Sequence, residues 1–149
     1  MSRRSRSRAL GEIVRVRKAQ EKAAEMAVGL ANLELRRLGE EREQRLRKLE
    51  DDQARWVAAM TGASLDPAMS AVWSAAVLAR EADVRSTTAD IADAEDVKAE
   101  RSGDWRAALA RSNVARDLAE SARRSERRAL EESALADLAD RFAQPGRRR

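Results

Sequence analysis

The sequence predicts an all-α protein, a long antiparallel two-helix coiled coil or helical hairpin, on three observations. Alanine, glutamate, arginine and leucine are abundant, as in long helices, while the chain has only two prolines and six glycines. Apolar residues recur at the heptad period on both sides of one strong break near the middle. The 149 residues are 43% hydrophobic but only 3% aromatic, so we expect a thin seam between helices rather than a globular interior.

The first helix is predicted over residues 10–60, after a basic, flexible stretch at residues 1–9. Two adjacent lines of apolar residues follow the seven-residue step: Val14, Val28, Leu35, Leu49 and Trp56 on one, and Leu10, Ala24, Ala31, Leu38 and Ala59 on the other. Charged residues interrupt both lines, namely Arg17, Glu21, Arg42, Arg45 and Asp52. Long side-chain stems can cover apolar surface, so we expect a weak seam that these residues partly bridge.

A turn is predicted at residues 61–67. The first helix ends at residues 61–63, where Gly62 is free to adopt a left-handed conformation. Asp66 and Pro67 form a good N-cap and first-turn pair for the next helix. These signals are typical of a helical hairpin.

The second arm is predicted over residues 67–142, and a basic tail follows at residues 143–149. Its seven-residue step runs through Val77, Val84, Ile91, Lys98 and Trp105. Trp105 is therefore expected to pack in the core. Serine and arginine dominate from residue 119 to residue 129, so we expect a poor seam there.

The two arms differ in length. At 1.5 Å per residue the first helix would reach about 75 Å and the second arm roughly 110 Å. Either the second arm breaks at residues 86–88, where Thr87 could cap a new helix ahead of Asp90, or it overhangs its partner uninterrupted. We favour the break, which makes residues 67–85 a short tip segment.

The composition argues against enzymatic chemistry. The chain has no cysteine and no histidine, which removes thiolate chemistry and the commonest general base and metal ligand. The sequence contains no pattern typical of a phosphate-binding loop, a metal cluster or a nucleophile with its base, so we expect no cofactor. The longest nearly apolar run, residues 71–79, is too short to span a bilayer, which predicts a cytoplasmic protein without membrane insertion.

Positive charge gathers at the two ends of the chain. Removing the seven terminal arginines from the 30 basic residues leaves 23 against 26 acidic ones in the body. These arginines are Arg3, Arg4, Arg6, Arg8, Arg147, Arg148 and Arg149. A hairpin would bring them together, either as solvated tails or as a surface for an acidic partner or for nucleic acid. The body has no basic stripe, which argues against nucleic acid.

Three features of the chain are typical of one known protein family. They are the stretch RALGEIVRVRKAQEKAAEMAVGLANLELRRL, the stretch ALEESALADLADRF and the break between them with an aromatic residue on each side. The chain resembles the FliJ family of flagellar type III export proteins, related to injectisome stalk proteins, over essentially its whole length. FliJ chains commonly end on a Glu-rich segment, an apolar residue before an Asp-Glu pair, an apolar residue, Ala and Arg. The matching residues are Glu131, Leu135, Asp137, Leu138, Ala139 and Arg141, with Ala136 where the family usually has Asp.

The resemblance implies a non-enzymatic coiled coil, similar in shape to the central stalk of rotary ATPases, at the inner face of the membrane export apparatus. It implies three partners: the export ATPase ring, the cytoplasmic domain of the export gate, and export chaperones whose substrate handover the protein assists. The gate contact is attributed to the tip, which corresponds by position to Leu49, Trp56, Trp73 and Val77. The arginine ends would then dock on the ATPase. The alternative is a structural coiled coil that binds nucleic acid through its basic ends or oligomerises through its seam.

Overall fold

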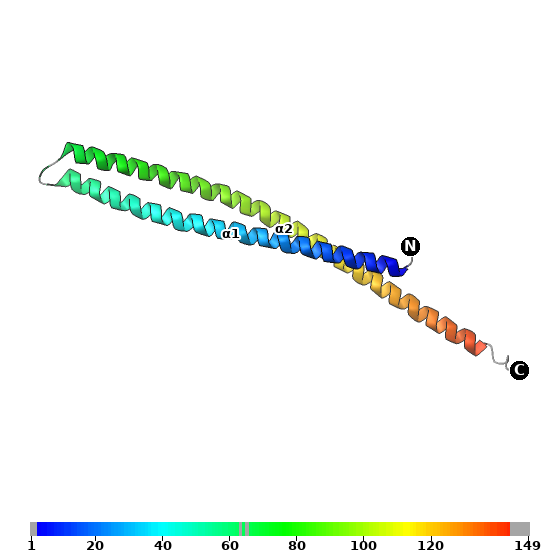
Figure 1. Ribbon diagram of the computed structural model, residues 1–149. Coiled ribbons are helices and arrows are strands. Elements are labelled where there is room, and N and C mark those ends of the chain that lie inside the picture. The colour runs from blue at the N-terminus through cyan, green and yellow to red at the C-terminus, as the bar shows by residue number, and fades with distance from the viewer. Residues whose placement is uncertain (1–2, 63, 65, 144–149) are drawn as a thin grey trace. The chain divides into compact units, whose positions relative to one another are not determined.

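A computed structural model, which describes residues 3–62, 64 and 66–143, contains two long α-helices and no strand in this part of the chain (Figure 1). Helix α1 spans Arg3–Thr61 and helix α2 spans Pro67–Ala143. The prediction of an all-α helical hairpin is confirmed. Helix α1 begins seven residues earlier than expected, since arginine, serine and alanine can all be accommodated in a helix.

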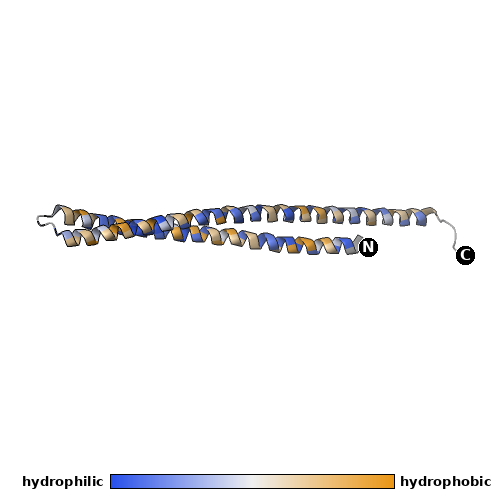
Figure 2. Cartoon of the chain, turned by 90° about the horizontal axis from the view of Figure 1, so that it is seen from above, coloured by the Kyte–Doolittle hydropathy of each residue, from blue (hydrophilic) through white to orange (hydrophobic). Residues whose placement is uncertain are grey.

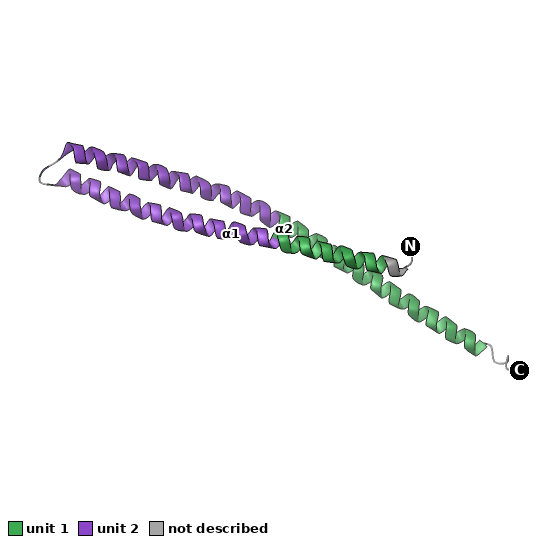
Figure 3. Cartoon of the chain, viewed as in Figure 1, with its two compact units in different colours: residues 1–24, 104–149 green, residues 25–103 purple. Residues whose placement is uncertain are grey.

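The chain divides into two compact units, each made from one stretch of both helices (Figure 3). One, called unit 2, comprises residues 25–103 and contains the turn. The other, unit 1, pairs residues 1–24 with residues 104–149. Figure 2 shows hydrophilic and hydrophobic residues interspersed along both helices, as expected where only one stripe of each helix is buried.

The seam that the heptad pattern predicts on α1 is present in both units. All ten residues of the two apolar lines are buried or half-buried, and Leu38 is the most deeply buried of them. On α2 in unit 2, Val77 is only 6% exposed, and Val84 and Ile91 are half-buried. The packing of these residues removes a narrow strip of apolar surface from water, which is the main stabilising contribution available to a two-helix protein.

The seam of unit 1 is built from small residues on α2. After the half-buried Trp105, its buried positions are Ala108, Ser112, Ala115 and Ala119, which keep the alternating spacing of three and four. Opposite them on α1, the half-buried Glu21 accepts a hydrogen bond from Lys18 at 2.9 Å. The hydrogen bond from Lys18, and then the nearby Ser112 hydroxyl, hold the pKa of Glu21 below its usual range, although its Oε2 is buried without a hydrogen-bond partner in the described part of the chain.

The turn follows the predicted helix signals in part. Asp66 caps α2, because its Oδ1 accepts hydrogen bonds from the backbone N–H groups of Ala68 at 3.0 Å and Met69 at 3.4 Å. At the end of α1, the Thr61 hydroxyl donates to the Val57 carbonyl at 2.8 Å. Gly62 does not adopt the left-handed conformation that is open to a glycine at this position.

The predicted break at residues 86–88 is wrong, because α2 continues through it. The hydroxyl of Thr87 donates to the Asp83 carbonyl at 3.0 Å, and that of Thr88 donates to the Val84 carbonyl at 2.8 Å. Both hydroxyls are therefore satisfied inside the helix and need no capping role. Thr87 is only 1% exposed, so it fills a seam position instead of ending a helix.

The unequal arm lengths are resolved by an overhang. In unit 1, all α2 residues from 131 to 143 are exposed, because they extend past the start of α1. Residues 131–143 are called the overhang below. The second arm is therefore one uninterrupted helix that overhangs its partner, the alternative to the predicted break.

Polar contacts cross the seam of unit 2 at three levels. Arg80 Nε on α2 donates to the Asp52 carboxylate of α1 at 3.1 Å, and Asp52 is only 7% exposed. Arg42 Nε donates to the Thr88 hydroxyl at 3.1 Å. Arg45 reaches the Asp83 carbonyl at 3.1 Å. The Asp52–Arg80 and Arg42–Thr88 contacts each need one particular side chain on the other helix, so they favour one register over a slipped one, whereas a backbone carbonyl such as that of Asp83 is present at every position.

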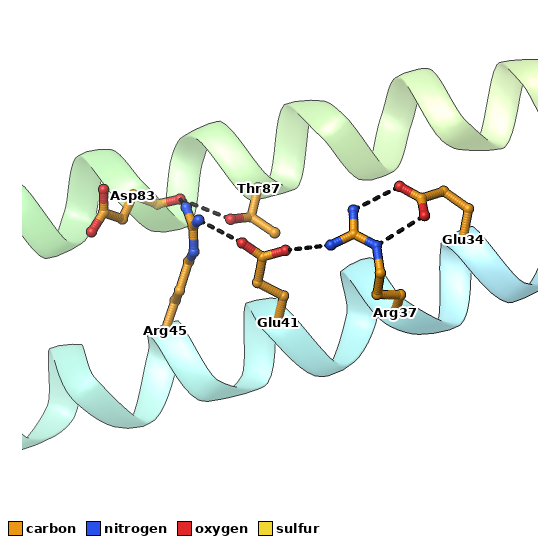
Figure 4. A network of polar contacts seen from close by, with 6 residues as sticks. All are labelled: Glu34, Arg37, Glu41, Arg45, Asp83 and Thr87. Carbon is orange, nitrogen blue, oxygen red and sulfur yellow. Dashed lines mark hydrogen bonds and ion pairs between the residues drawn. The ribbon is translucent and has the colours of Figure 1, made fainter.

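Figure 4 shows how the Arg45 contact extends into a network on α1. Glu41 accepts from Arg45 at 2.5 Å and from Arg37 at 3.2 Å, and Arg37 also donates twice to Glu34. Glu34 and then Glu41 raise the pKa of Arg37, while Arg37 lowers the pKa of Glu34. Arg37 and Glu34 lie in solvent, so we expect little stability from this part of the network.

The Asp52–Arg80 contact predicts a charge-swap result. Asp52→Arg should lower the free energy of unfolding by about 1–3 kcal/mol, because it places two cations together beside the seam. Arg80→Asp in the same chain should recover at least half of that loss. Urea denaturation followed by circular dichroism measures both. The control is Asp51→Arg, at an exposed neighbour. If Asp51→Arg destabilised the protein as much as Asp52→Arg does, the role of the Asp52–Arg80 contact would be contradicted.

Candidate functional site at the hairpin tip

The two tryptophans beside the turn pack in the seam of unit 2. Trp56 on α1 and Trp73 on α2 are both half-buried. The guanidinium carbon of Arg55 lies 5.2 Å from the centroid of the Trp73 ring, a cation–π distance. Arg55 also approaches Asp52 at 3.5 Å. The Trp73 ring is thus tied by Arg55 to the polar contacts of the seam.

Packing, rather than hydrogen bonding, positions the Trp56 ring. Its Nε1 is buried and has no hydrogen-bond acceptor within the part of the chain that the structure describes. A buried donor without a partner costs free energy, so the contacts of the ring must offset that cost.

The four tip residues predicted from the sequence lie close together but differ in exposure. Val77 is buried, while Leu49, Trp56 and Trp73 are half-buried. Val77 therefore supports the seam and offers almost no surface to a partner. Of the predicted tip residues, the exposed edges of the Trp56 and Trp73 rings are therefore the main surface that a partner could contact.

Four further apolar residues surround the turn and are well exposed. They are Val57 and Met60 near the end of α1 and Met69 and Val72 near the start of α2, with Val72 58% exposed. The Ser70 hydroxyl donates to the Met60 sulfur at 2.9 Å, which links the two helices beside the turn. We call these four residues, together with Trp56 and Trp73, the tip patch.

The tip patch lies in a window that is nearly free of charge. Between Arg55 and Arg80 the only charged residue is Asp66, in a chain that is 38% charged. Exposed apolar surface without neighbouring charges is typical of a protein-binding site. Methionine adds side-chain adaptability at such surfaces. The heptad pattern could have identified these residues, because all four lie outside the predicted seam positions and within two helical turns of the hairpin turn.

The structure describes only part of the basic end, which is the predicted docking surface made by the seven terminal arginines. Arg6 and Arg8 are exposed on the first turns of α1. Only the backbone of Arg3 and Arg4 is described, and Arg147, Arg148 and Arg149 lie outside the described residues. In unit 1, α2 adds arginines that the sequence interpretation did not count, namely Arg123, Arg124 and Arg128, which line surface grooves there.

Comparison of the chain with protein-family models, with characterised proteins and with solved structures finds no match. The resemblance to the FliJ family therefore rests on the sequence features alone. Within the described residues, neither helix has a stretch long and apolar enough to cross a bilayer.

The different burial of neighbouring tip residues predicts different stability effects. Trp73→Ala should lower the free energy of unfolding by about 1–3 kcal/mol, as should Trp105→Ala, because both half-buried rings fill the seam. Val72→Ala should change it by less than about 0.5 kcal/mol, since this side chain is in solvent. Thermal and urea melts give the comparison. A Val72 effect as large as that of Trp73 would show that our assignment of the exposed patch is wrong.

Proposed function

We propose that this protein is a non-enzymatic stalk or adaptor of flagellar type III protein export. In this proposal the tip patch binds the cytoplasmic domain of the membrane export gate. The basic end of unit 1 docks on the export ATPase ring, and the protein assists the handover of substrates from export chaperones. It would act in the cytoplasm, at the inner face of the export apparatus.

The observation that carries the proposal is the tip patch at the turn of a two-helix coiled coil. Its four exposed apolar side chains and the edges of two rings are available without any unfolding of the helices. Aromatic residues and methionine are enriched at protein interfaces, and a few such residues contribute most of the binding free energy. The seam already stabilises the rings, so a partner would meet a patch that is largely preorganised.

Electrostatics support the second contact. Arg6 and Arg8 project from the first turns of α1, and Arg123 and Arg124 add positive charge from α2 in the same unit. A cluster of this kind speeds encounter with an acidic protein surface and makes binding depend on salt. Any coupling to nucleotide hydrolysis would then be mechanical or regulatory, because the partner would carry the catalytic site.

Gate binding tests the tip directly. Val72→Asp with Met69→Asp should weaken binding to the isolated gate domain at least tenfold, because two charges would enter an apolar contact. The control is Leu30→Asp, at an apolar residue on α1 outside the patch that is at least as exposed as Val72 and Met69, and this variant should bind like the parent. Calorimetry measures the affinities. A parent protein that does not bind the gate, or a control that weakens as much, would contradict the proposal.

Ring binding tests the basic end. Replacing the seven terminal arginines by serine should weaken binding to the isolated export ATPase and lower helicity at most in the first turns of α1, which begins at Arg3. Duplex DNA affinity at two salt concentrations distinguishes the alternative function. Tight DNA binding that falls steeply with salt and disappears in the same variant would favour nucleic acid as the partner instead.

A further inference from the structure

The overhang of α2 presents an apolar stripe that no other helix in the described part of the chain covers. Leu135, Leu138 and Phe142 follow one another at spacings of three and four, so they lie on one side of the helix. Leu135 is 66% exposed and Phe142 is 81% exposed. Large apolar side chains in a row at this exposure are typical of a face that another helix covers.

The overhang is also acidic. It contains Glu131, Glu132, Asp137 and Asp140 against the single basic residue Arg141, a net charge of −3. All of these side chains are in solvent. An occupant of this face should therefore be both apolar and basic.

Unit 1 itself contains a surface of that kind. A shallow groove of about 370 Å³ runs between the first turns of α1 and the facing part of α2. Leu10, Leu118 and Ala122 form its apolar lining, and Arg6 lies at its edge. The grooves beside it are lined by further arginines, which are Arg8, Arg15, Arg123, Arg124 and Arg128. Outside the overhang, to which Glu132 belongs, Glu12 and Glu126 are the acidic residues among these linings, so the surroundings of the groove are net positive.

The overhang cannot reach the groove of its own chain. Helix α2 continues without a break to Ala143, and its residues 118–126 form one wall of the groove. The overhang therefore leaves the groove along the axis of that wall and cannot turn back to cover it. An overhang that fills the groove must come from another molecule.

We propose that two copies of this chain pair through unit 1, with the overhang of each copy docked in the groove of the other. Leu138 and Phe142 would cover Leu10 and Leu118 of the second copy, and the acidic residues of the overhang would face its arginines. The apolar stripe from Leu135 to Phe142 is about 10 Å long, close to the roughly 12 Å that residues 118–126 of α2 span along the groove. A two-fold arrangement uses each surface once and closes at two copies. This proposal does not depend on the function proposed above.

Sedimentation velocity over a concentration series tests the pairing. The full chain should show a monomer–dimer equilibrium that weakens as salt is raised, because opposite charges meet across the contact. Phe142→Asp should weaken dimerisation at least tenfold, and Leu30→Asp, at an exposed leucine outside both surfaces, should leave it unchanged. Circular dichroism of each variant checks that the helices persist. A parent chain that remains monomeric would overturn the proposal. So would a result in which the Leu30→Asp variant no longer dimerises while the Phe142→Asp variant still does.

Charge reversal gives a sharper result. Asp137→Arg with Asp140→Arg makes the overhang basic, and Arg6→Glu with Arg8→Glu makes the edge of the groove acidic. Each variant alone should dimerise at least tenfold more weakly than the parent, since like charges then meet. An equimolar mixture should form a heterodimer, because each overhang then finds a groove of opposite charge. If the mixture associates no better than the separate variants, the assigned surfaces are wrong.

Discussion

The contact between Asp52 and Arg80 shows the constraint on which the structure depends: a thin seam must be kept in one register. Two helices bury only one stripe each, and alanine supplies many of the apolar positions. Seams of similar small residues pack almost equally well after a slip of one heptad. A carboxylate that is 7% exposed and accepts from a guanidinium on the other helix penalises such a slip, because either group would lose its partner.

Register also determines which residues remain available for binding. With Trp56 and Trp73 held on the seam, their sequence neighbours on the turn side, Val57 after Trp56 and Val72 before Trp73, are exposed beside the turn. In unit 1, the same pairing leaves Leu118 half-exposed beside Leu10 and leaves residues 131–143 uncovered. The two proposed uses of Arg6 and Arg8, docking on a ring and pairing with a second copy, require the same surface. A dimer would therefore have to dissociate before the ring could bind.

The sequence predicted the fold and the α1 seam because large apolar residues at the heptad step stand out from a charged background. The α2 seam of unit 1 did not stand out, since Ala108, Ser112 and Ala115 differ little from the many small residues around them. The break at Thr87 was predicted wrongly because β-branched and hydroxyl side chains lower helix propensity. Seam packing and a hydrogen bond to the Asp83 carbonyl outweigh that preference here. Among the site residues, Val77 begins the heptad step on α2, and that step indicated its burial correctly; its assignment to a partner-facing tip surface came from its position beside the turn and is not supported by the packing.

The most direct test of the central claim, an intramolecular antiparallel hairpin in one register, is cysteine cross-linking in this naturally cysteine-free chain. Arg42→Cys with Thr88→Cys places thiols at two positions whose side chains are hydrogen-bonded at 3.1 Å. A short bismaleimide should link them within one chain, and should link Arg42→Cys poorly to Glu81→Cys or Glu95→Cys, one heptad away in either direction. Preferential linkage to either shifted position, or linkage only between chains, would contradict the register and the hairpin on which both proposed surfaces depend.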